Sequence, residues 1–275
     1  MSKQLMSKQL KISRRELAGV AMAGTVLRRS FAQESTTGEM AGLKYIVPKK
    51  PEQVAMLVYP GMTALDLVGP QQVFGYMMMG AIELVWKTKN PVRTDTGLSI
   101  VPSKTFAECP ETVDILFVPG GGRETIALME DSETTQFLAA RGKSARLVTS
   151  VCSGSLVLGA AGLLKGYKAT SHWSVRDVLS LLGATPVKAR YVEDRNRVTA
   201  GGVTSGIDFG LRLAAKLRGE DYARSLQLNL EYDPQPPFQS GTPEQAGQRV
   251  AGAMTAMYQP LVEAARAAAQ RLKIA

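Results

Sequence analysis

One ten-residue stretch carries three structural signals in succession: Leu147-Val148-Thr149-Ser150-Val151-Cys152-Ser153-Gly154-Ser155-Leu156. The apolar and β-branched residues at its start predict a buried strand, and the small residues Gly154 and Ser155 begin a helix. Cys152 lies at the corner between them, where a side chain is held above the sheet as in a nucleophile elbow. We therefore predict that Cys152 is a nucleophile and that the N-terminus of the following helix lowers its thiol pKa, which favours the reactive thiolate. The alternative is that Cys152 is a small buried apolar residue, as free cysteines often are.

Strand and helix patterns alternate along the chain on both sides of this corner. Unbroken apolar runs predict further buried strands at Val54–Tyr59, Ile82–Trp86 and Val113–Val118. The alternation predicts an α/β fold, a three-layer sandwich with helices on both faces of a mostly parallel central sheet. Active sites in such sheets lie at the carboxyl ends of the strands. We therefore expect Asp66, residues 120–122 and Cys152 to meet at one edge of the sheet.

The second half of the chain predicts a hairpin and several helices. The expected elements are a helix capped by Ser174 and ending at Leu182, a hairpin over 191–200, and helices at Ile207–Leu217, Asp221–Leu230 and from about Pro243. We assign residues 52–240 to a single α/β domain and residues 241–275 to a C-terminal helical extension. A single final helix does not supply a helix-turn-helix, so no nucleic-acid partner is expected.

The positive charge of the chain is concentrated at its start. The chain has 275 residues and a net charge of +9, and residues 1–32 carry seven basic residues and one acidic one. Arg14-Arg15, the apolar run Leu17–Leu27 and Ser30-Phe31-Ala32 predict a twin-arginine signal peptide over 1–32, followed by a loose linker over 33–51. We therefore expect a periplasmic, exported protein with no stable membrane anchor. The alternative is a disordered N-terminus without a targeting role.

The small numbers of cysteine and histidine residues limit the disulfides and metal sites that the chain can form. The chain has two cysteines and one histidine, too few for a disulfide framework, a zinc site made of cysteines or a cluster of histidine ligands. We therefore expect no metal. Cys109 precedes Pro110 in a predicted loop with no neighbouring charge pattern, and we interpret it as inert.

Several spaced motifs resemble the ThiJ/PfpI superfamily, whose fold is the class I glutamine amidotransferase-like (flavodoxin-like) sandwich. The motifs are Tyr59-Pro60-Gly61 with Leu65-Asp66, Val118-Pro119-Gly120-Gly121, Val151-Cys152-Ser153-Gly154-Ser155, Ala169-Thr170-Ser171-His172-Trp173, Gly201-Gly202-Val203-Thr204-Ser205-Gly206-Ile207-Asp208 and Glu231-Tyr232-Asp233-Pro234. Within the superfamily they are most similar to the isonitrile hydratases. The resemblance covers residues 54–238 and implies a cofactor-free enzyme that hydrates an isonitrile to an N-substituted formamide.

The resemblance also implies roles for individual residues. Cys152 attacks the isonitrile carbon to form a thioimidate, and Asp66 is the acid and base. Ser153 orients water or an intermediate, and the backbone N–H groups of Gly121 and Ser153 stabilise negative charge. Asp233 and His172 are expected to support the site without reacting. The alternatives from the residues alone are a helix N-cap for Asp66 and a turn residue for Asp233.

The sequence departs from the superfamily pattern after the nucleophile. Proteases and glyoxalases of the superfamily often have a histidine there, whereas this chain has Ser153, which disfavours a Cys-His dyad. We expect His172 to pack beside Trp173 as a structural residue. Phe74, Tyr76 and Trp173 are the expected pocket lining, which suggests an apolar substituent on the substrate.

Three other functions are the alternatives to an isonitrile hydratase. A redox sensor needs an exposed cysteine of low pKa, a ligand-binding module resembles domains of transcription regulators, and a glyoxalase-like hydratase acts on small aldehydes. Turnover separates an enzyme from a sensor. The resemblance further implies a homodimer.

Overall fold

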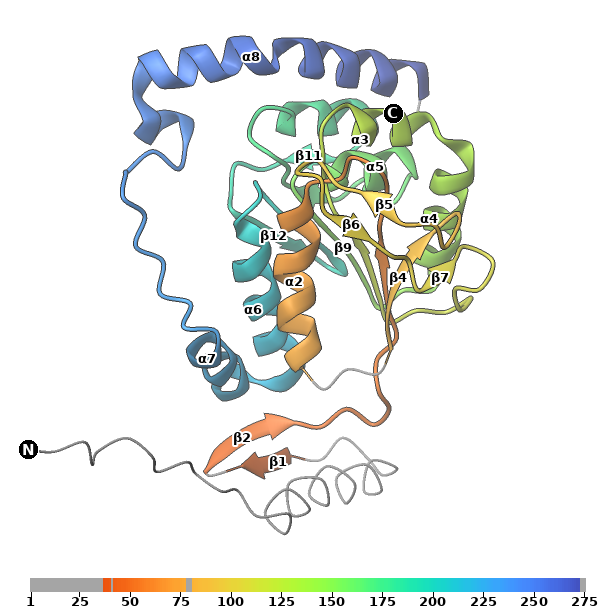
Figure 1. Cartoon of the computed structure of the whole chain (residues 1–275), viewed down its shortest axis with the longest axis vertical. Helices are drawn as coiled ribbons and strands as arrows, with labels where there is room; N and C mark the ends of the chain where they lie inside the picture. The colour runs from red at the N-terminus through yellow and green to blue at the C-terminus, as the bar shows by residue number, and fades with distance from the viewer. Residues whose placement is uncertain (1–36, 41, 78–80, 273–275) are drawn as a thin grey trace, which may run out of the picture.

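A computed structural model describes residues 37–40, 42–77 and 81–272 of the chain. Within these residues, seven strands form a central sheet in the order β12-β13-β9-β8-β3-β4-β7 (Figure 1). The strands are β12 (Tyr191–Asp194), β13 (Arg197–Ala200), β9 (Leu147–Val151), β8 (Ile115–Val118), β3 (Val54–Leu57), β4 (Ile82–Trp86) and β7 (Lys104–Thr105). All neighbours are parallel except β12 and β13, so the prediction of a mostly parallel sheet is confirmed.

The three central strands are buried along their length because helices cover both of their faces. Every residue of β3, β8 and β9 is buried, as expected for parallel strands inside a sandwich. The register pairs Leu116 of β8 with Val148 of β9. The carboxyl ends of these strands therefore meet at one edge, where β3 precedes the loop to Asp66 and β9 precedes Cys152.

Helices form the two outer layers. One layer holds α2 (Ala64–Tyr76), α6 (Ser205–Arg218) and α7 (Glu220–Asn229), and the other holds α3 (Arg123–Glu130), α4 (Ser132–Ser144) and α5 (Gly154–Ala160). Phe74 of α2 and Phe209 of α6 pack on Phe117 of β8, with ring centroids 6.4 and 5.8 Å away. The predicted three-layer α/β sandwich is confirmed.

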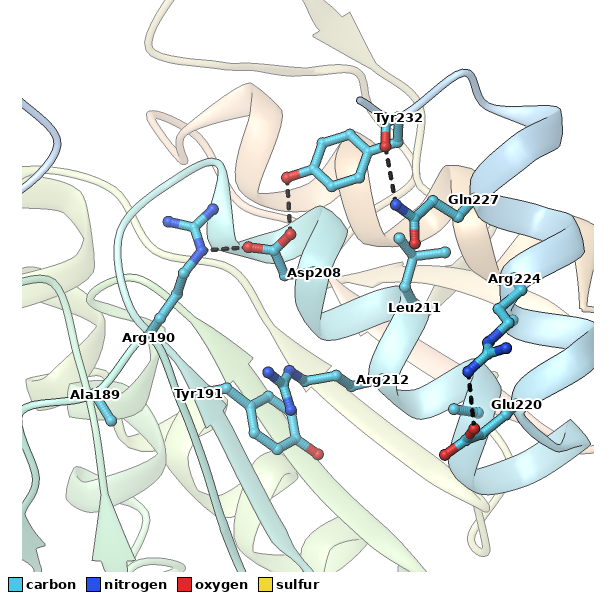
Figure 2. Close-up of a pocket in the computed structure, with 12 residues that line it drawn as sticks. Ala189, Arg190, Tyr191, Asp208, Leu211, Arg212, Glu220, Arg224, Gln227 and Tyr232 are labelled. Atoms are coloured by element: carbon cyan, nitrogen blue, oxygen red, sulfur yellow. Dashed lines mark hydrogen bonds and ion pairs between the residues drawn. The ribbon is translucent and has the colours of Figure 1, made fainter. Parts of the chain in front are cut away.

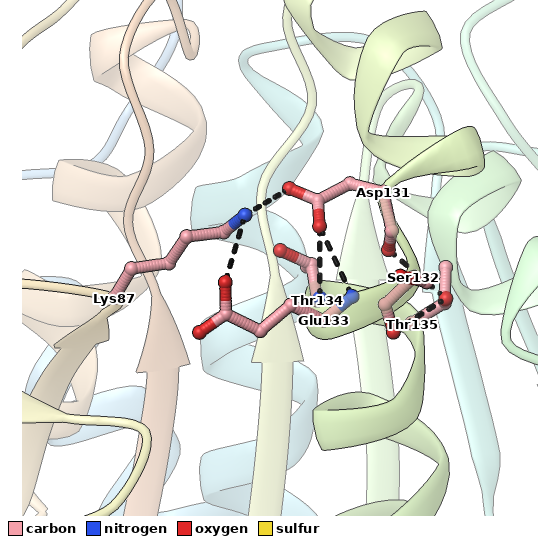
Figure 3. A network of polar contacts seen from close by, with 6 residues as sticks. All are labelled: Lys87, Asp131, Ser132, Glu133, Thr134 and Thr135. Carbon is pink, nitrogen blue, oxygen red and sulfur yellow. Dashed lines mark hydrogen bonds and ion pairs between the residues drawn. The ribbon is translucent and has the colours of Figure 1, made fainter.

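A polar network fastens α4 to the end of β4. Asp131 caps the helix by accepting hydrogen bonds from the N–H groups of Glu133 and Thr134, at 3.1 and 3.3 Å. Lys87 follows β4 and pairs with Asp131 and Glu133 (Figure 3). The cap satisfies N–H groups that helix formation leaves without partners, and the lysine ties this helix end to the sheet.

Among the described residues, short strands outside the central sheet form separate two-stranded sheets. These are β1 (Thr37–Met40) with β2 (Leu43–Ile46), β5 (Val92–Arg93) with β6 (Ser99–Ile100), and β10 (Lys168–Ala169) with β11 (Thr185–Pro186). The hairpin predicted over 191–200 is confirmed as β12 and β13.

Two local expectations are wrong. Residues 37–40 and 43–46 of the expected loose linker pair as β1 and β2, and Tyr45 packs on Tyr222 of α7 with ring centroids 5.7 Å apart. The helix expected after Ser174 is a 3-10 helix, η1 (Arg176–Leu182), and no side chain caps it. Ser174 does not cap because its hydroxyl pairs with His172 instead. The predicted signal peptide over 1–32 lies outside the described residues.

The C-terminal extension is α8 (Pro243–Leu272), which Figure 1 shows as the long helix across the top of the view. It contacts α3 and η1 through the buried residues Ala265, Ala268 and Ala269. Gly247 interrupts the helix with a φ of 74°. None of the helices in the described part of the chain has both the length and the apolar character needed to cross a membrane.

Candidate active site

The corner at Cys152 has the backbone geometry of a nucleophile elbow. Cys152 has a φ of 58°, a left-handed conformation that is strained for any residue with a side chain. Its N–H donates to the carbonyls of Ala200 and Gly201 at 3.1 and 2.8 Å, and its carbonyl accepts from the Ser171 hydroxyl at 3.0 Å. These bonds hold the strained residue in place, and the predicted elbow is confirmed.

Glycines let two backbone segments approach at this corner. A Cβ on Gly154 would lie 2.3 Å from the carbonyl oxygen of Val118, and one on Gly120 would lie 2.6 Å from the Ser153 nitrogen. Neither distance is compatible with a side chain. The loop after β8 therefore packs directly against the elbow because both positions are glycine.

Asp66 lies beneath this loop in the first turn of α2. Its side chain is fully buried, and its Oδ2 accepts a hydrogen bond from the Gly120 N–H at 3.0 Å. Burial raises its pKa to about 7, although hydrogen bonds with the Cys152 thiol and the Gly120 N–H oppose the rise. A carboxyl with this pKa can both give and take a proton near neutral pH.

The alternative that Asp66 caps its own helix is wrong. Thr63 is the N-cap residue of α2, and the N–H of Ala64 donates to the carboxylate of Asp95 at 3.1 Å. The Asp66 carboxyl points instead to the elbow. The structure thus brings Asp66 and Cys152 together from segments that are far apart in sequence.

The expected low pKa of the Cys152 thiol is wrong. Burial raises the pKa of Cys152 well above its usual value, and the negative charge of Asp66 raises it further. A hydrogen bond from the Ser153 N–H acts in the opposite direction but is outweighed. The helix after the elbow, α5, has only seven residues, so its dipole does not overcome burial beside a carboxylate. The resting nucleophile is a neutral thiol.

Ser153 links the elbow to the glycine loop. Its hydroxyl donates to the carbonyl of Gly121 at 2.8 Å and accepts from the N–H of the same residue at 3.0 Å. Ser153 and Gly121 are therefore adjacent to Cys152, as the sequence suggests. The Gly121 N–H is already engaged by this hydroxyl, so it reaches a reacting atom only if the Ser153 side chain rotates.

A pocket of about 570 Å³ opens onto Cys152. It is lined by Gly61, Thr63, Thr94, Asp95, Gly121, Gly122, Glu124, Cys152, Ser153, His172, Ser174, Val175, Val203, Tyr258 and Leu261. Of this lining, Cys152, Ser153, Gly121 and His172 were assigned a role in the site from the sequence, and Gly122 was expected at the same edge of the sheet. Tyr258 and Leu261 come from α8, and no motif indicates that this distant helix reaches the site.

The pocket lining expected from the sequence is wrong. Phe74 is fully buried between Phe117 and Phe209 in the core, and Tyr76 lies on the surface. Trp173 lines two neighbouring pockets, and its ring packs on His172, which lines the pocket of Cys152. Aromatic side chains alone did not indicate which face of α2 points to the sheet.

His172 lies at the wall of the pocket as a neutral ring. Its Nδ1 pairs with the Ser174 hydroxyl at 2.8 Å, and its ring packs on Trp173 and Tyr258 with centroids 5.5 and 5.3 Å away. Burial lowers its pKa to about 4. The expected packing beside Trp173 is confirmed, and His172 carries no charge at neutral pH.

Asp233 does not join the site. It is exposed after α7, and its carboxylate accepts a hydrogen bond from the side chain of Gln235 at 3.1 Å. Its neighbour Tyr232 donates to Asp208, which also pairs with Arg190, in a separate pocket between β12, α6 and α7 (Figure 2). The motif around Asp233 therefore borders this second pocket and not that of Cys152.

Comparisons with known proteins agree with this geometry. The model of the DJ-1/PfpI family matches residues 52–216, more than half of the chain. This protein belongs to the DJ-1/PfpI family. An isonitrile hydratase from Pseudomonas putida is 50% identical over 194 residues, which cover 70% of this chain and 84% of that protein. The crystal structure of a ThiJ/PfpI family protein from Pseudomonas syringae has a TM-score of 0.78 and 54% identity, and the match covers 80% of this chain and 90% of that one.

A more distant match is the HTH-type transcriptional regulator GbdR from Pseudomonas aeruginosa. It is 27% identical over 195 residues, which cover 67% of this chain and 52% of the regulator.

The DJ-1/PfpI match includes most but not all of the pocket. Asp66, Gly121, Cys152, Ser153 and His172 lie inside the matched residues, whereas the pocket residues of α8 lie beyond them. No group of three or more His, Cys, Asp or Glu side chains in the described part of the chain could hold a metal ion. The chemistry that the DJ-1/PfpI site offers is therefore a thiol and a carboxyl that share a buried corner.

Proposed function

We propose that this protein hydrates an isonitrile to an N-substituted formamide through a covalent thioimidate on Cys152. The observation that carries the proposal is the Cys152 thiol, held at a strained elbow against the buried Asp66 carboxyl. The 50% identity to an isonitrile hydratase over most of that protein supports the choice of substrate. The net reaction adds one water without oxidation or reduction, so it needs no cofactor.

The first half of the reaction forms the thioimidate. The Cys152 proton moves to the terminal carbon of R–N≡C with Asp66 as the relay, and the sulfur bonds to the same carbon. The product is R–N=CH–S–Cys152. A raised thiol pKa suits this route because the thiol supplies the proton that activates the isonitrile carbon. The Asp66 pKa of about 7 lets its carboxyl accept and return that proton at neutral pH.

The second half releases the formamide. Asp66 as carboxylate takes a proton from water, whose oxygen bonds to the thioimidate carbon, and the nitrogen receives that proton from Asp66. The carbon–sulfur bond then breaks, the hydroxyl proton returns to sulfur, and R–NH–CHO leaves. The Ser153 hydroxyl lies next to the elbow and orients the water. Its rotation frees the Gly121 N–H, which stabilises charge together with the Ser153 N–H as the tetrahedral centre forms.

The other chemistries fit the site less well. A redox sensor depends on a thiolate, whereas burial and Asp66 keep the Cys152 thiol protonated. A glyoxalase-like reaction with a histidine base requires a ring of higher pKa than His172, which burial lowers to about 4. Both alternatives therefore lack a group that their chemistry uses.

The proposal includes a homodimer and an exported location. Leu65 and Val68 of α2 are each 42% exposed and Tyr76 is 44% exposed, so this helix has apolar side chains that a second copy would cover. Arg14-Arg15 supports export by the twin-arginine route, with residues 1–32 removed and residues 52–240 and 241–275 as the domain and its extension. Light scattering of the purified protein, and the N-terminal sequence of the exported form, test these two points.

The direct test is turnover of cyclohexyl isonitrile, with N-cyclohexylformamide measured by nuclear magnetic resonance. Wild-type protein and Cys109→Ala form the formamide at similar rates, because Cys109 lines none of the pockets described above. Cys152→Ala forms none, and Asp66→Asn slows turnover about 10²–10⁴-fold. Absence of formamide with the wild-type protein, or equal turnover by Cys152→Ala, overturns the proposal.

A further inference from the structure

The face of α8 that packs on the domain continues into the active-site pocket. Tyr258 and Leu261 line the pocket and are three residues apart, so they lie on the same side of the helix. The same face continues to Ala265 and Ala268, both fully buried. The two pocket residues are therefore part of the surface by which α8 packs on the domain, and their positions are set by that packing.

Contacts at several points hold this face in place. Tyr258 packs on His172 and Trp173, with ring centroids 5.3 and 5.6 Å away. Near the end of α8, Arg271 forms a two-pronged ion pair with Glu130 of α3, at 2.6 and 2.9 Å. The helix thus presents Tyr258 and Leu261 to the pocket as a fixed wall.

The pocket lining is of two chemical kinds. Asp95, Glu124 and the Ser153 hydroxyl are polar, whereas the neutral ring of His172 and the side chains of Val175, Val203, Tyr258 and Leu261 are apolar or uncharged. Cys152 lines the same pocket. In a linear R–N≡C group the substituent is at the far end from the reacting carbon, so a substrate bonded to Cys152 directs its substituent away from the sulfur.

We propose that Tyr258 and Leu261 form a specificity wall that selects isonitriles with a bulky apolar substituent over small ones. This inference rests on the proposed function and names the substrate class for the same site. The pocket of about 570 Å³ has room for a ring, and burial of a ring against Tyr and Leu side chains favours it over a methyl group. Because α8 lies beyond the matched family domain, the substrate preference is set by a segment outside that domain.

The first test compares kcat/KM for cyclohexyl isonitrile and methyl isonitrile. The cyclohexyl-to-methyl ratio falls about tenfold in Tyr258→Ala and in Leu261→Ala, mainly through a higher KM for the ring. Tyr258→Phe keeps the ratio, because the ring and not the hydroxyl forms the wall. Met257→Ala, a change at an exposed neighbour on the same helix, leaves it unchanged. Circular dichroism confirms that each variant is folded.

The second test removes turnover from the measurement. Alkylation of Cys152 by 2-chloroacetamide and by N-cyclohexyl-2-chloroacetamide is followed by mass spectrometry in the same variants. The wall predicts the same fall in the cyclohexyl-to-unsubstituted rate ratio in Tyr258→Ala and Leu261→Ala. If the wild-type protein hydrates neither isonitrile but the alkylation ratio still falls, the proposed function fails and the wall stands. If both ratios are unchanged in the two alanine variants, or if Tyr258→Phe loses as much as Tyr258→Ala, the wall is wrong.

Discussion

The two cysteines of this chain are both buried, yet their surroundings differ in ways that separate a nucleophile from a core residue. Burial raises the thiol pKa of both Cys152 and Cys109. The nearest charge at Cys109 is Arg141, which lowers its pKa, whereas Asp66 raises that of Cys152. Cys152 also has a strained backbone and a pocket in front of it. A carboxyl partner and access, and not an acidic thiol, distinguish the reactive cysteine here.

Access gives the largest expected difference between the two thiols. Cys152 lines a pocket although only 6% of its surface is exposed, whereas Cys109 is packed in the core with 3% of its surface exposed. We expect iodoacetamide to label Cys152 at least about 100-fold faster than Cys109 in the folded protein, because labelling of Cys109 requires the structure to open. Peptide mapping after a short pulse measures both rates. Equal labelling rates at Cys152 and Cys109 would show that access does not distinguish the two thiols.

The elbow itself can be broken at Gly154. A Cβ there meets the Val118 carbonyl oxygen at 2.3 Å, so Gly154→Ala should lower the free energy of unfolding by about 3 kcal/mol and abolish turnover. Gly75→Ala on α2 is the matched control, because a Cβ at Gly75 meets no atom within 4 Å. That variant should gain about 0.5–1 kcal/mol from its higher helix propensity. Denaturant unfolding of both variants tests the prediction, which fails if Gly154→Ala is as stable as the wild type.

The buried carboxyl of Asp66 predicts a dependence of stability on pH. Its folded pKa of about 7 lies above its ordinary value of 3.8, so between these pH values the folded protein holds a proton that the unfolded chain releases. Stability from this group is complete below about pH 4 and is lost as the pH rises to about 7. Relative to Asp66→Asn, the free energy of unfolding of the wild type should fall by on the order of 2–4 kcal/mol as the pH rises from about 4 to about 7.

Urea unfolding at several pH values measures this loss. Asp233→Asn is the control, since that carboxylate is exposed and does not line the pocket of Cys152. A difference between wild type and Asp66→Asn that is independent of pH would contradict the raised pKa.

The smallest effect is expected at the second cysteine. Cys109→Ala removes a sulfur from the core and should cost about 1 kcal/mol of stability, with turnover within twofold of the wild type. Thermal unfolding and the formamide assay measure the two quantities. A loss of turnover without a loss of stability would show that Cys109 has a role that the structure does not explain.

The sequence was sufficient to predict the sheet and the elbow because both depend on local patterns. Apolar runs identify buried strands, and a cysteine between a strand and a glycine marks the corner. The approach of Asp66 to Cys152 also follows, since the carboxyl ends of parallel strands share an edge.

The remainder of the site depends on tertiary packing. The pKa of Cys152 was predicted in the wrong direction because burial and a carboxylate outweigh a short helix. Asp233 follows a helix that ends beside another pocket, and its distance from Cys152 is not encoded in its spacing along the chain. Tyr258 and Leu261 reach the pocket only because α8 folds back over α3 and η1.

The most direct test of the Cys152–Asp66 pair is the thiol pKa of Cys152 in wild type and in Asp66→Asn, measured together with turnover. Thiolate absorbance as a function of pH, corrected with Cys152→Ala, gives the pKa. We expect opposite effects: removal of the carboxylate lowers the Cys152 pKa, yet turnover falls at least about 100-fold because the proton relay is lost. A Cys152 pKa that does not fall in Asp66→Asn, or turnover that is retained, would contradict it.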